Sequence, residues 1–167
     1  MGQAASPRKT RIRRVGESYD SFGAACEVVE RLFRLGQDFE DLDPERDRDR
    51  RQALIEEATA LFSEDVENVT RDGTLYGTGR FFSDWEVQTK DFEVRLEQPK
   101  FLDAGEGRVV AVFRMVRRAR EGDDHMATWP ATVYRVRDGK IVFFEGYPDR
   151  NKALRDLGLD PSMARGR

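Results

Sequence analysis

The residue types that usually carry metal or thiol chemistry are almost absent from this sequence. It contains one histidine, His125, and one cysteine, Cys26, in 167 residues. A structural zinc site needs four Cys or His ligands, and a catalytic one needs three protein ligands, so we expect no metal site. We expect no cofactor either. A single cysteine cannot form a disulfide within the chain. The chemistry that remains is that of carboxylates, tyrosine, threonine and arginine.

Charge is distributed unevenly along the chain. The sequence has 29 basic and 32 acidic residues, for a net charge of −3. Residues 1–14 hold five of the basic residues and none of the acidic ones, so the rest of the chain carries a net charge of −8. An acidic body does not attract phosphates, and we therefore expect no nucleic-acid partner. Residues 1–17 are predicted to be a disordered basic tail.

Continuous apolar stretches are short, the longest being Val109–Phe113. A transmembrane helix needs about 20 apolar residues, and a secretory signal peptide needs an apolar region of its own. We therefore expect no membrane partner and a cytoplasmic location.

The elements that position the reactive residues begin with helices. Ser21 is expected to cap a first helix that apolar residues at helical spacing carry to Leu35. Gly36 is expected to end it, and Asp38–Asp43 is then an acidic loop.

Two more helices are predicted before the middle of the sequence. Asp43 is a candidate cap for the second, with Pro44 in its first position. A short third helix is indicated by residues at helical spacing, three of them aromatic: Phe81, Phe82, Trp85 and Thr89.

Strand patterns dominate the second half. Val66–Thr70 is a short strand candidate and Arg71–Gly79 a glycine-punctuated loop. From Phe92 onward, apolar residues alternate or run continuously, which predicts four strands: Phe92–Leu102, Val109–Arg118, His125–Arg137 and Lys140–Tyr147. Asp138-Gly139 predicts a tight hairpin turn between the last two, and Arg150–Leu157 a short final helix.

Helices followed by strands of this kind predict an α+β domain with helices on one face of a curved antiparallel sheet. We expect one domain over residues 18–160 and a second tail over residues 161–167. The strands are apolar on both faces. The face that does not meet the helices would expose a large apolar patch, which usually marks an interface, so we expect a sheet-to-sheet homodimer. Its residues are Val110, Val112, Trp129, Ala131, Val133, Phe143 and Tyr147.

Several segments, taken in order, are similar to one known family. Val133–Ile141 resembles the hairpin signature of SnoaL-like proteins, in the nuclear transport factor 2-like superfamily, and Tyr147–Leu154 resembles the segment that follows it. Leu61–Val66 resembles the family's helix-to-strand junction, and Gly79–Phe82 resembles the entry to its third helix. The likeness covers residues 20–158.

The resemblance implies a cone-shaped, curved sheet, mixed or antiparallel, that packs on three N-terminal helices and is followed by a short C-terminal helix. It also implies an enclosed apolar pocket and, commonly, a homodimer. The family includes polyketide cyclases, ketosteroid isomerase, limonene-epoxide hydrolase and many proteins with no known reaction. Because one fold hosts many functions, the pocket residues must decide.

The family's catalytic positions are occupied here by residues that cannot do its chemistry. The ketosteroid isomerase base falls on about Thr70, and its two oxyanion donors fall on about Val29 and on Thr132. The facing His and Asp of the polyketide cyclases fall on Thr132 and Gly146, and the Asp of the epoxide hydrolase also falls near Gly146. Threonine does not replace a carboxylate base and glycine has no side chain, so those three reactions are not expected.

The remaining candidates suit binding rather than catalysis. We expect a small apolar ligand in the pocket, contacted by Thr70, Tyr76, Trp85, Phe113, Thr132, Tyr134 and Phe144. The structural alternative is that the Tyr and Thr hydroxyls are satisfied by neighbouring backbone and that Trp85 is helix-to-sheet core.

Two other functions stay open. The first is an isomerase, cyclase or hydratase acting on a polyketide- or steroid-like substrate with a non-standard base. Glu145 is the weak candidate, because it would turn into the pocket only if the strand parity shifted by one residue. The second is an interaction module whose pocket is filled by its own side chains and which serves a partner through the basic tail. His125 is expected at an exposed sheet rim and Cys26 as an inert thiol.

Overall fold

A mixed sheet of seven strands is the frame of the protein. The computed structural model describes residues 18–165, and the predicted tail over residues 1–17 lies outside them. The strands are β1 (Phe62–Thr70), β2 (Gly73–Tyr76), β3 (Phe92–Asp103), β4 (Arg108–Ala119), β5 (His125–Thr128), β6 (Ala131–Arg137) and β7 (Lys140–Tyr147). Their order is β2-β1-β7-β6-β4-β3, with β5 also paired to β4. The β1–β7 pair is parallel and the other pairs are antiparallel.

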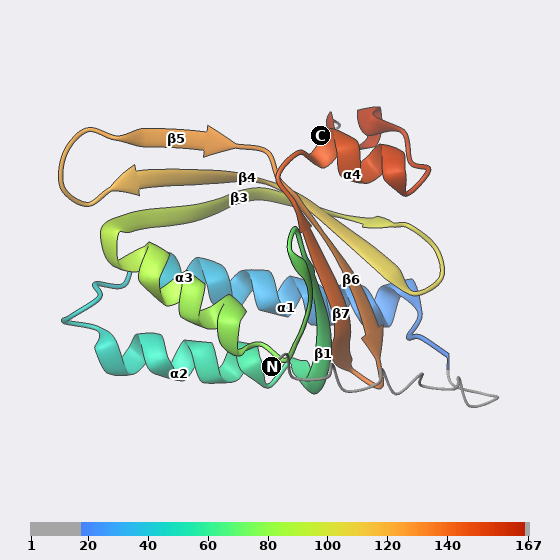
Figure 1. Cartoon of the computed structure of the whole chain (residues 1–167), viewed down its shortest axis with the longest axis horizontal. Coiled ribbons are helices and arrows are strands. Elements are labelled where there is room, and N and C mark those ends of the chain that lie inside the picture. Colours follow the sequence, from blue (N-terminus) through green and yellow to red (C-terminus); the bar gives the residue numbers. More distant parts are fainter. Residues whose placement is uncertain (1–17, 166–167) are drawn as a thin grey trace, which may run out of the picture.

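Helices lie on both faces of this sheet. The three N-terminal helices, α1 (Phe22–Glu40), α2 (Arg48–Thr59) and α3 (Gly79–Asp91), lie on one side. The C-terminal helix α4 (Arg150–Asp156) and the 3₁₀ helix η1 (Pro161–Arg165) lie on the other (Figure 1). The predicted α+β class, with a mixed sheet on three N-terminal helices and a short C-terminal helix, is confirmed.

The first helix begins as predicted but ends later. The Ser21 hydroxyl accepts a hydrogen bond from the Ala24 amide at 3.3 Å. Gly36 does not end the helix, which continues to Glu40. A Cβ atom at Gly36 would lie 3.1 Å from the Leu96 Cδ1 atom, so this glycine allows close packing against β3 rather than supplying a cap.

The second helix begins later than predicted. A carboxylate oxygen of Asp43 accepts from the amides of Glu45 and Arg46, at 2.9 and 2.8 Å. These bonds form a separate turn, and the helix itself starts at Arg48. A capping residue is equally favourable at the start of a turn, which is why the sequence signal misplaced the boundary.

Two strand predictions also differ from the structure. The expected loop over residues 71–79 contains β2, which pairs with β1 as a hairpin. The expected strand His125–Arg137 is interrupted at Trp129 and Pro130 and becomes β5 and β6. Proline lacks the amide that a continuous strand needs.

The core between the helices and the sheet is rich in aromatic contacts. The Phe33 ring on α1 packs edge-on against Phe101 and Phe113, with centroids 5.4 and 5.1 Å apart. The Phe62 ring on β1 packs edge-on against the Phe144 ring on β7, with centroids 5.3 Å apart. These contacts fix α1 over β3 and β4 and hold β1 to β7.

The opposite face of the sheet is covered by the chain's own C-terminal segment. Ala153 and Leu154 of α4 and Ala164 of η1 are buried in one cluster with four sheet residues: Val110, Val112, Ala131 and Val133. The expected tail over residues 161–167 is therefore wrong for residues 161–165. The prediction that this sheet face is uncovered is also wrong for Val110, Val112, Ala131 and Val133. The sheet-to-sheet homodimer stays a prediction.

None of the helices in residues 18–165 is both long and apolar enough to cross a membrane.

Candidate functional site

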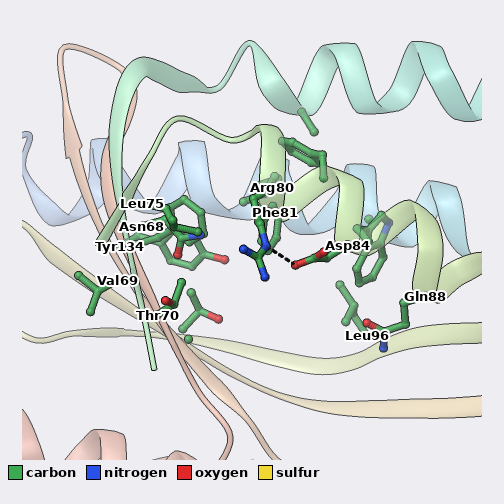
Figure 2. Close-up of a pocket in the computed structure, with 18 of the residues that line it drawn as sticks. Asn68, Val69, Thr70, Leu75, Arg80, Phe81, Asp84, Gln88, Leu96 and Tyr134 are labelled. Atoms are coloured by element: carbon green, nitrogen blue, oxygen red, sulfur yellow. Dashed lines mark ion pairs between the residues drawn. The ribbon is translucent and has the colours of Figure 1, made fainter. Parts of the chain in front are cut away.

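An apolar pocket opens between the sheet and the helices α1 and α3 (Figure 2). Its volume is about 610 Å³, which lies within the usual range for small-molecule sites. The walls are mainly apolar and include Leu32, Phe33, Phe39, Leu54, Phe81, Phe82, Trp85, Leu96, Phe113, Met115 and Phe144. The interaction-module alternative requires a pocket that is filled by its own side chains. This pocket is open.

Polar groups reach this pocket from neighbouring sheet strands. Asn68 on β1 and Tyr134 on β6 each pair in register with Phe144 on β7, so the three form a row across the sheet. In the next row, Thr132 pairs with Gly146. All five residues line the pocket. The missing side chain at Gly146 leaves open space there, since a Cβ atom would meet nothing within 4 Å.

Tyr134 is a buried hydrogen-bonding group at this wall. Its side chain is almost fully buried. Burial raises the pKa of Tyr134 above its usual value, and the hydrogen bond from the Thr132 hydroxyl opposes that rise. The phenol therefore stays protonated near neutral pH and can donate a hydrogen bond.

Thr70 also lines the pocket, but its hydroxyl serves the β1–β2 turn. It donates to the Gly73 carbonyl at 2.8 Å and accepts from the Asp72 amide at 3.3 Å. The sequence left open whether this hydroxyl contacts a ligand or is satisfied by neighbouring backbone. In the structure it is satisfied by backbone.

Charged residues lie at the mouth of the pocket. Arg80 and Asp84 on α3 form an ion pair at 3.6 Å, and their side chains are 72% and 71% exposed. In Figure 2 this pair faces Thr70 and Tyr134 across the opening. Arg71 and Asp72 of the β1–β2 turn complete the rim, so the charges at the mouth balance.

Six of the seven residues expected to contact a ligand line this pocket: Thr70, Trp85, Phe113, Thr132, Tyr134 and Phe144. Tyr76 does not, and it is 61% exposed. On β2 the pocket lining comprises Gly73, Thr74 and Leu75 and ends there. Because side chains alternate along a strand, Tyr76 points to the face opposite Leu75. Trp85 also packs against Phe39, with ring centroids 6.1 Å apart, so it is both core and pocket wall.

Glu145 lies on the face of the sheet opposite the pocket. It pairs in register with Val133 of the outer cluster, and its carboxylate hydrogen bonds the Tyr147 hydroxyl. Arg135, on the neighbouring strand β6, forms an ion pair with Glu106 at 3.6 Å. Glu145 therefore cannot serve as a base in the pocket.

Asn68 was missed by the sequence reading. It is 8% exposed and lines the pocket. One feature of the sequence could have indicated it. Asn68 lies two residues from Val66 and therefore on the same buried face of the strand, where an apolar residue is the usual choice.

The other residues with reactive side chains lie away from the pocket. His125 is exposed on β5. The Cys26 thiol donates to a Glu30 carboxylate oxygen at 3.7 Å. Burial, the Glu30 charge and this hydrogen bond raise the pKa of Cys26 to about 11. Val29, which stands where the ketosteroid isomerase has one of its oxyanion donors, is fully buried. Within residues 18–165, no three His, Cys, Asp or Glu side chains gather as a metal site would need.

A second cavity, of about 1090 Å³, lies between α2, the end of α3 and the β4–β5 turn. Charges of both signs line it, including Arg51, Arg120, Glu86 and Asp91. The nearly buried Arg51 donates to the Thr89 hydroxyl at 2.8 Å, and Arg120 donates to the Thr89 carbonyl at 2.9 Å. These bonds give both arginines a structural role in joining α2, α3 and the β4–β5 turn.

Comparison with solved structures identifies the fold. A protein from Xanthomonas campestris that is described as a polyketide cyclase is similar to this chain, with a TM-score of 0.59 and 16% identity. The alignment covers 82% of this chain and 99% of that protein. AclR, a proposed hydroxylase from Streptomyces galilaeus, matches 83% over 98% of its own length, with a TM-score of 0.60 and 14% identity. A nuclear transport factor 2-like protein of unknown function from Burkholderia pseudomallei matches 79% over 95%, with a TM-score of 0.53 and 19% identity.

The chain has the nuclear transport factor 2-like fold. The resemblance to SnoaL-like proteins read from the sequence is thereby confirmed at the level of the fold. No protein-family model matches the sequence, and no curated protein matches it. The similar structures do not agree on one activity, so the reaction, if there is one, must be argued from the pocket.

Proposed function

We propose that this protein binds a small, mostly apolar molecule in the pocket between the sheet and α1 and α3. The observation that carries the proposal is the open pocket of about 610 Å³, with an apolar lining and a few polar groups on one wall. Such a pocket is the usual form of a small-molecule site. Two of the similar structures are described as polyketide cyclases. We therefore choose polycyclic aromatic compounds as the first class of ligand to test.

Binding is favoured over catalysis because of where the carboxylates lie. Proton-transfer catalysis needs a base within hydrogen-bond reach of the substrate. The acids among the described pocket residues are Asp72 and Asp84, both exposed at the mouth. Glu145, which the isomerase, cyclase or hydratase alternative would use, faces away. The cytoplasmic location and the homodimer stay predictions.

The direct test is mass spectrometry of small molecules extracted from the purified protein. The proposal predicts one discrete apolar species in near-stoichiometric amount. The Gly146→Phe variant, which places a ring in the open space between Thr70 and Thr132, should retain little of it. The matched control is Gly23→Phe, at an exposed position on α1 with nothing within 4 Å of its Cβ.

Equal amounts of the species in both variants would place it outside this pocket. No extracted species, together with a melting temperature unchanged by a panel of polycyclic ligands, would contradict the proposal. A glycine weakens a strand interior, so Gly146→Phe should fold at least as stably as the wild type. Loss of the ligand then reports blockage rather than unfolding.

A further inference from the structure

Asn68 is a nearly buried residue whose side-chain amide has no hydrogen-bond partner among the described residues. Asn68 is 8% exposed, and its amide has no hydrogen bond or ion pair with any of residues 18–165. The amide atoms are not sealed off from the pocket, and an amide left unpaired in an apolar site is costly once a ligand displaces the water from it. Where such a group lines a pocket, a ligand that pairs with it removes that cost.

The surroundings of this amide define what could pair with it. Asn68 and Tyr134 flank Phe144 in one row of the sheet, and Figure 2 shows both at the same end of the pocket, beside Leu75. The Thr132 and Tyr134 hydroxyls hydrogen bond to each other, which uses one of their two hydrogens and leaves the other for an acceptor. The wall therefore offers two kinds of donor, the Asn68 amide N–H and an O–H of the Tyr134–Thr132 hydroxyl pair.

Charge narrows the chemistry further. The cations of the described pocket lining are Arg71 and Arg80, at the mouth, and Arg80 is already paired with Asp84. A carboxylate seated against Asn68 would be buried away from these cations, which is unfavourable. An uncharged acceptor oxygen has no such cost.

We propose that Asn68 and Tyr134 recognise an uncharged carbonyl oxygen, of a ketone, ester or amide, on an otherwise apolar ligand. This inference rests on the proposed function, because it concerns the ligand of the same pocket. It makes Asn68 a specificity-determining residue, whose amide distinguishes a carbonyl compound from the corresponding hydrocarbon and from the corresponding carboxylate.

The test uses three probes with the same aromatic body: acetylnaphthalene, ethylnaphthalene and naphthoate. Their affinities are measured by titration calorimetry for the wild type and for Asn68→Leu, which has a similar size and no hydrogen-bonding group. The matched control is Gln52→Leu, an exposed amide on α2 outside this pocket.

The inference predicts that the wild type binds acetylnaphthalene about tenfold more tightly than ethylnaphthalene, the ratio expected for one net hydrogen bond. It predicts weaker binding of naphthoate than of acetylnaphthalene. In Asn68→Leu the preference for the ketone should disappear while ethylnaphthalene still binds, and in Gln52→Leu it should remain.

Each contrary result has a distinct meaning. Equal binding of the ketone and the hydrocarbon by the wild type, or an undiminished ketone preference in Asn68→Leu, would overturn the role of Asn68 and leave the proposed function standing. Tightest binding of naphthoate would also overturn it. Failure of all three probes to bind would contradict the proposed function and this inference with it.

One readout needs no ligand. Replacing a nearly buried amide that makes no hydrogen bond with an apolar side chain of similar size loses no bond, and is neutral or stabilising. Asn68→Leu should therefore melt at or above the temperature of the ligand-free wild type. A clear decrease would show that the amide has a structural partner and would overturn the inference.

Discussion

Truncating Leu154 tests whether the C-terminal helix is an integral part of the domain. Leu154 on α4 is fully buried in the cluster that α4 and η1 form with the outer face of the sheet. The Leu154→Ala change removes the apolar contact and leaves a cavity, which for a buried leucine costs about 2–5 kcal/mol. We expect a loss of about 3 kcal/mol in the free energy of unfolding.

For a domain of this size, each kcal/mol lowers the melting temperature by about 2–4 °C, so the expected decrease is about 6–12 °C. Urea titration gives the free energy of unfolding directly. Arg155→Ala, one position along the same helix and exposed, should change stability by about 0.5 kcal/mol or less.

A Leu154→Ala loss smaller than about 1 kcal/mol would contradict the packing of α4 on the sheet. The outer face would then be open, and the sheet-to-sheet dimer expected from the sequence would regain its premise.

Two further predictions concern the outer face and the cysteine. If a sheet-to-sheet homodimer forms, it must use the uncovered part of the face around Trp129, which is 41% exposed and lies 4.4 Å from the Arg150 guanidinium. Trp129→Asp should then give monomer or aggregate in sedimentation, while Met126→Asp, also exposed, should not; an unaltered dimer in Trp129→Asp rejects this contact. The pKa of Cys26 is raised from 9.0 to about 11, so its thiolate fraction at pH 8 is about a hundredfold lower than in the unfolded chain. Alkylation of the folded protein should be slower by that factor, and Glu30→Gln should speed it; equal rates for folded and unfolded protein would refute the shift.

The thiol also gives a sign for the pH dependence of stability. Its folded-state pKa lies above its unfolded value, so folding disfavours the thiolate. The stability contribution of the neutral thiol is therefore present below pH 9 and declines as the pH rises from about 9 toward 11.

In the last hairpin, the tight turn could be predicted from the sequence, but the bulge beside it could not. Asp138 and Gly139 both have positive φ, 50° and 74°, as the predicted tight turn requires. Beyond the turn, the pairing shifts by one residue between Val136, opposite Ile141, and Arg135, opposite Phe143. This bulge decides which face Glu145 occupies, because residues opposite each other share a face.

Without the bulge, counting back from the turn would place Glu145 opposite Thr132, in the pocket. Both faces of β7 carry apolar residues, so hydrophobic alternation does not report the bulge. The resemblance to the SnoaL-like hairpin supplied what the periodicity lacked, since it paired Thr132 with Gly146.

The C-terminal segment was misjudged for a different reason. Residues 161–165 form little more than one helical turn, and Ala164 is the buried residue among them. A single small apolar residue gives no periodic signal. Its burial follows from the tertiary position that α4 gives it, which the sequence pattern does not encode.

The central claim is that the pocket against Trp85 and Gly146 takes up an apolar molecule, and tryptophan emission tests it most directly. The sequence has two tryptophans, so Trp129→Phe leaves Trp85 in the pocket wall as the reporter. Decalone, a bicyclic ketone, should change the Trp85 emission saturably in this protein, and Gly146→Phe in the same background should abolish the change. A response that does not saturate, or one that survives Gly146→Phe, would contradict the account.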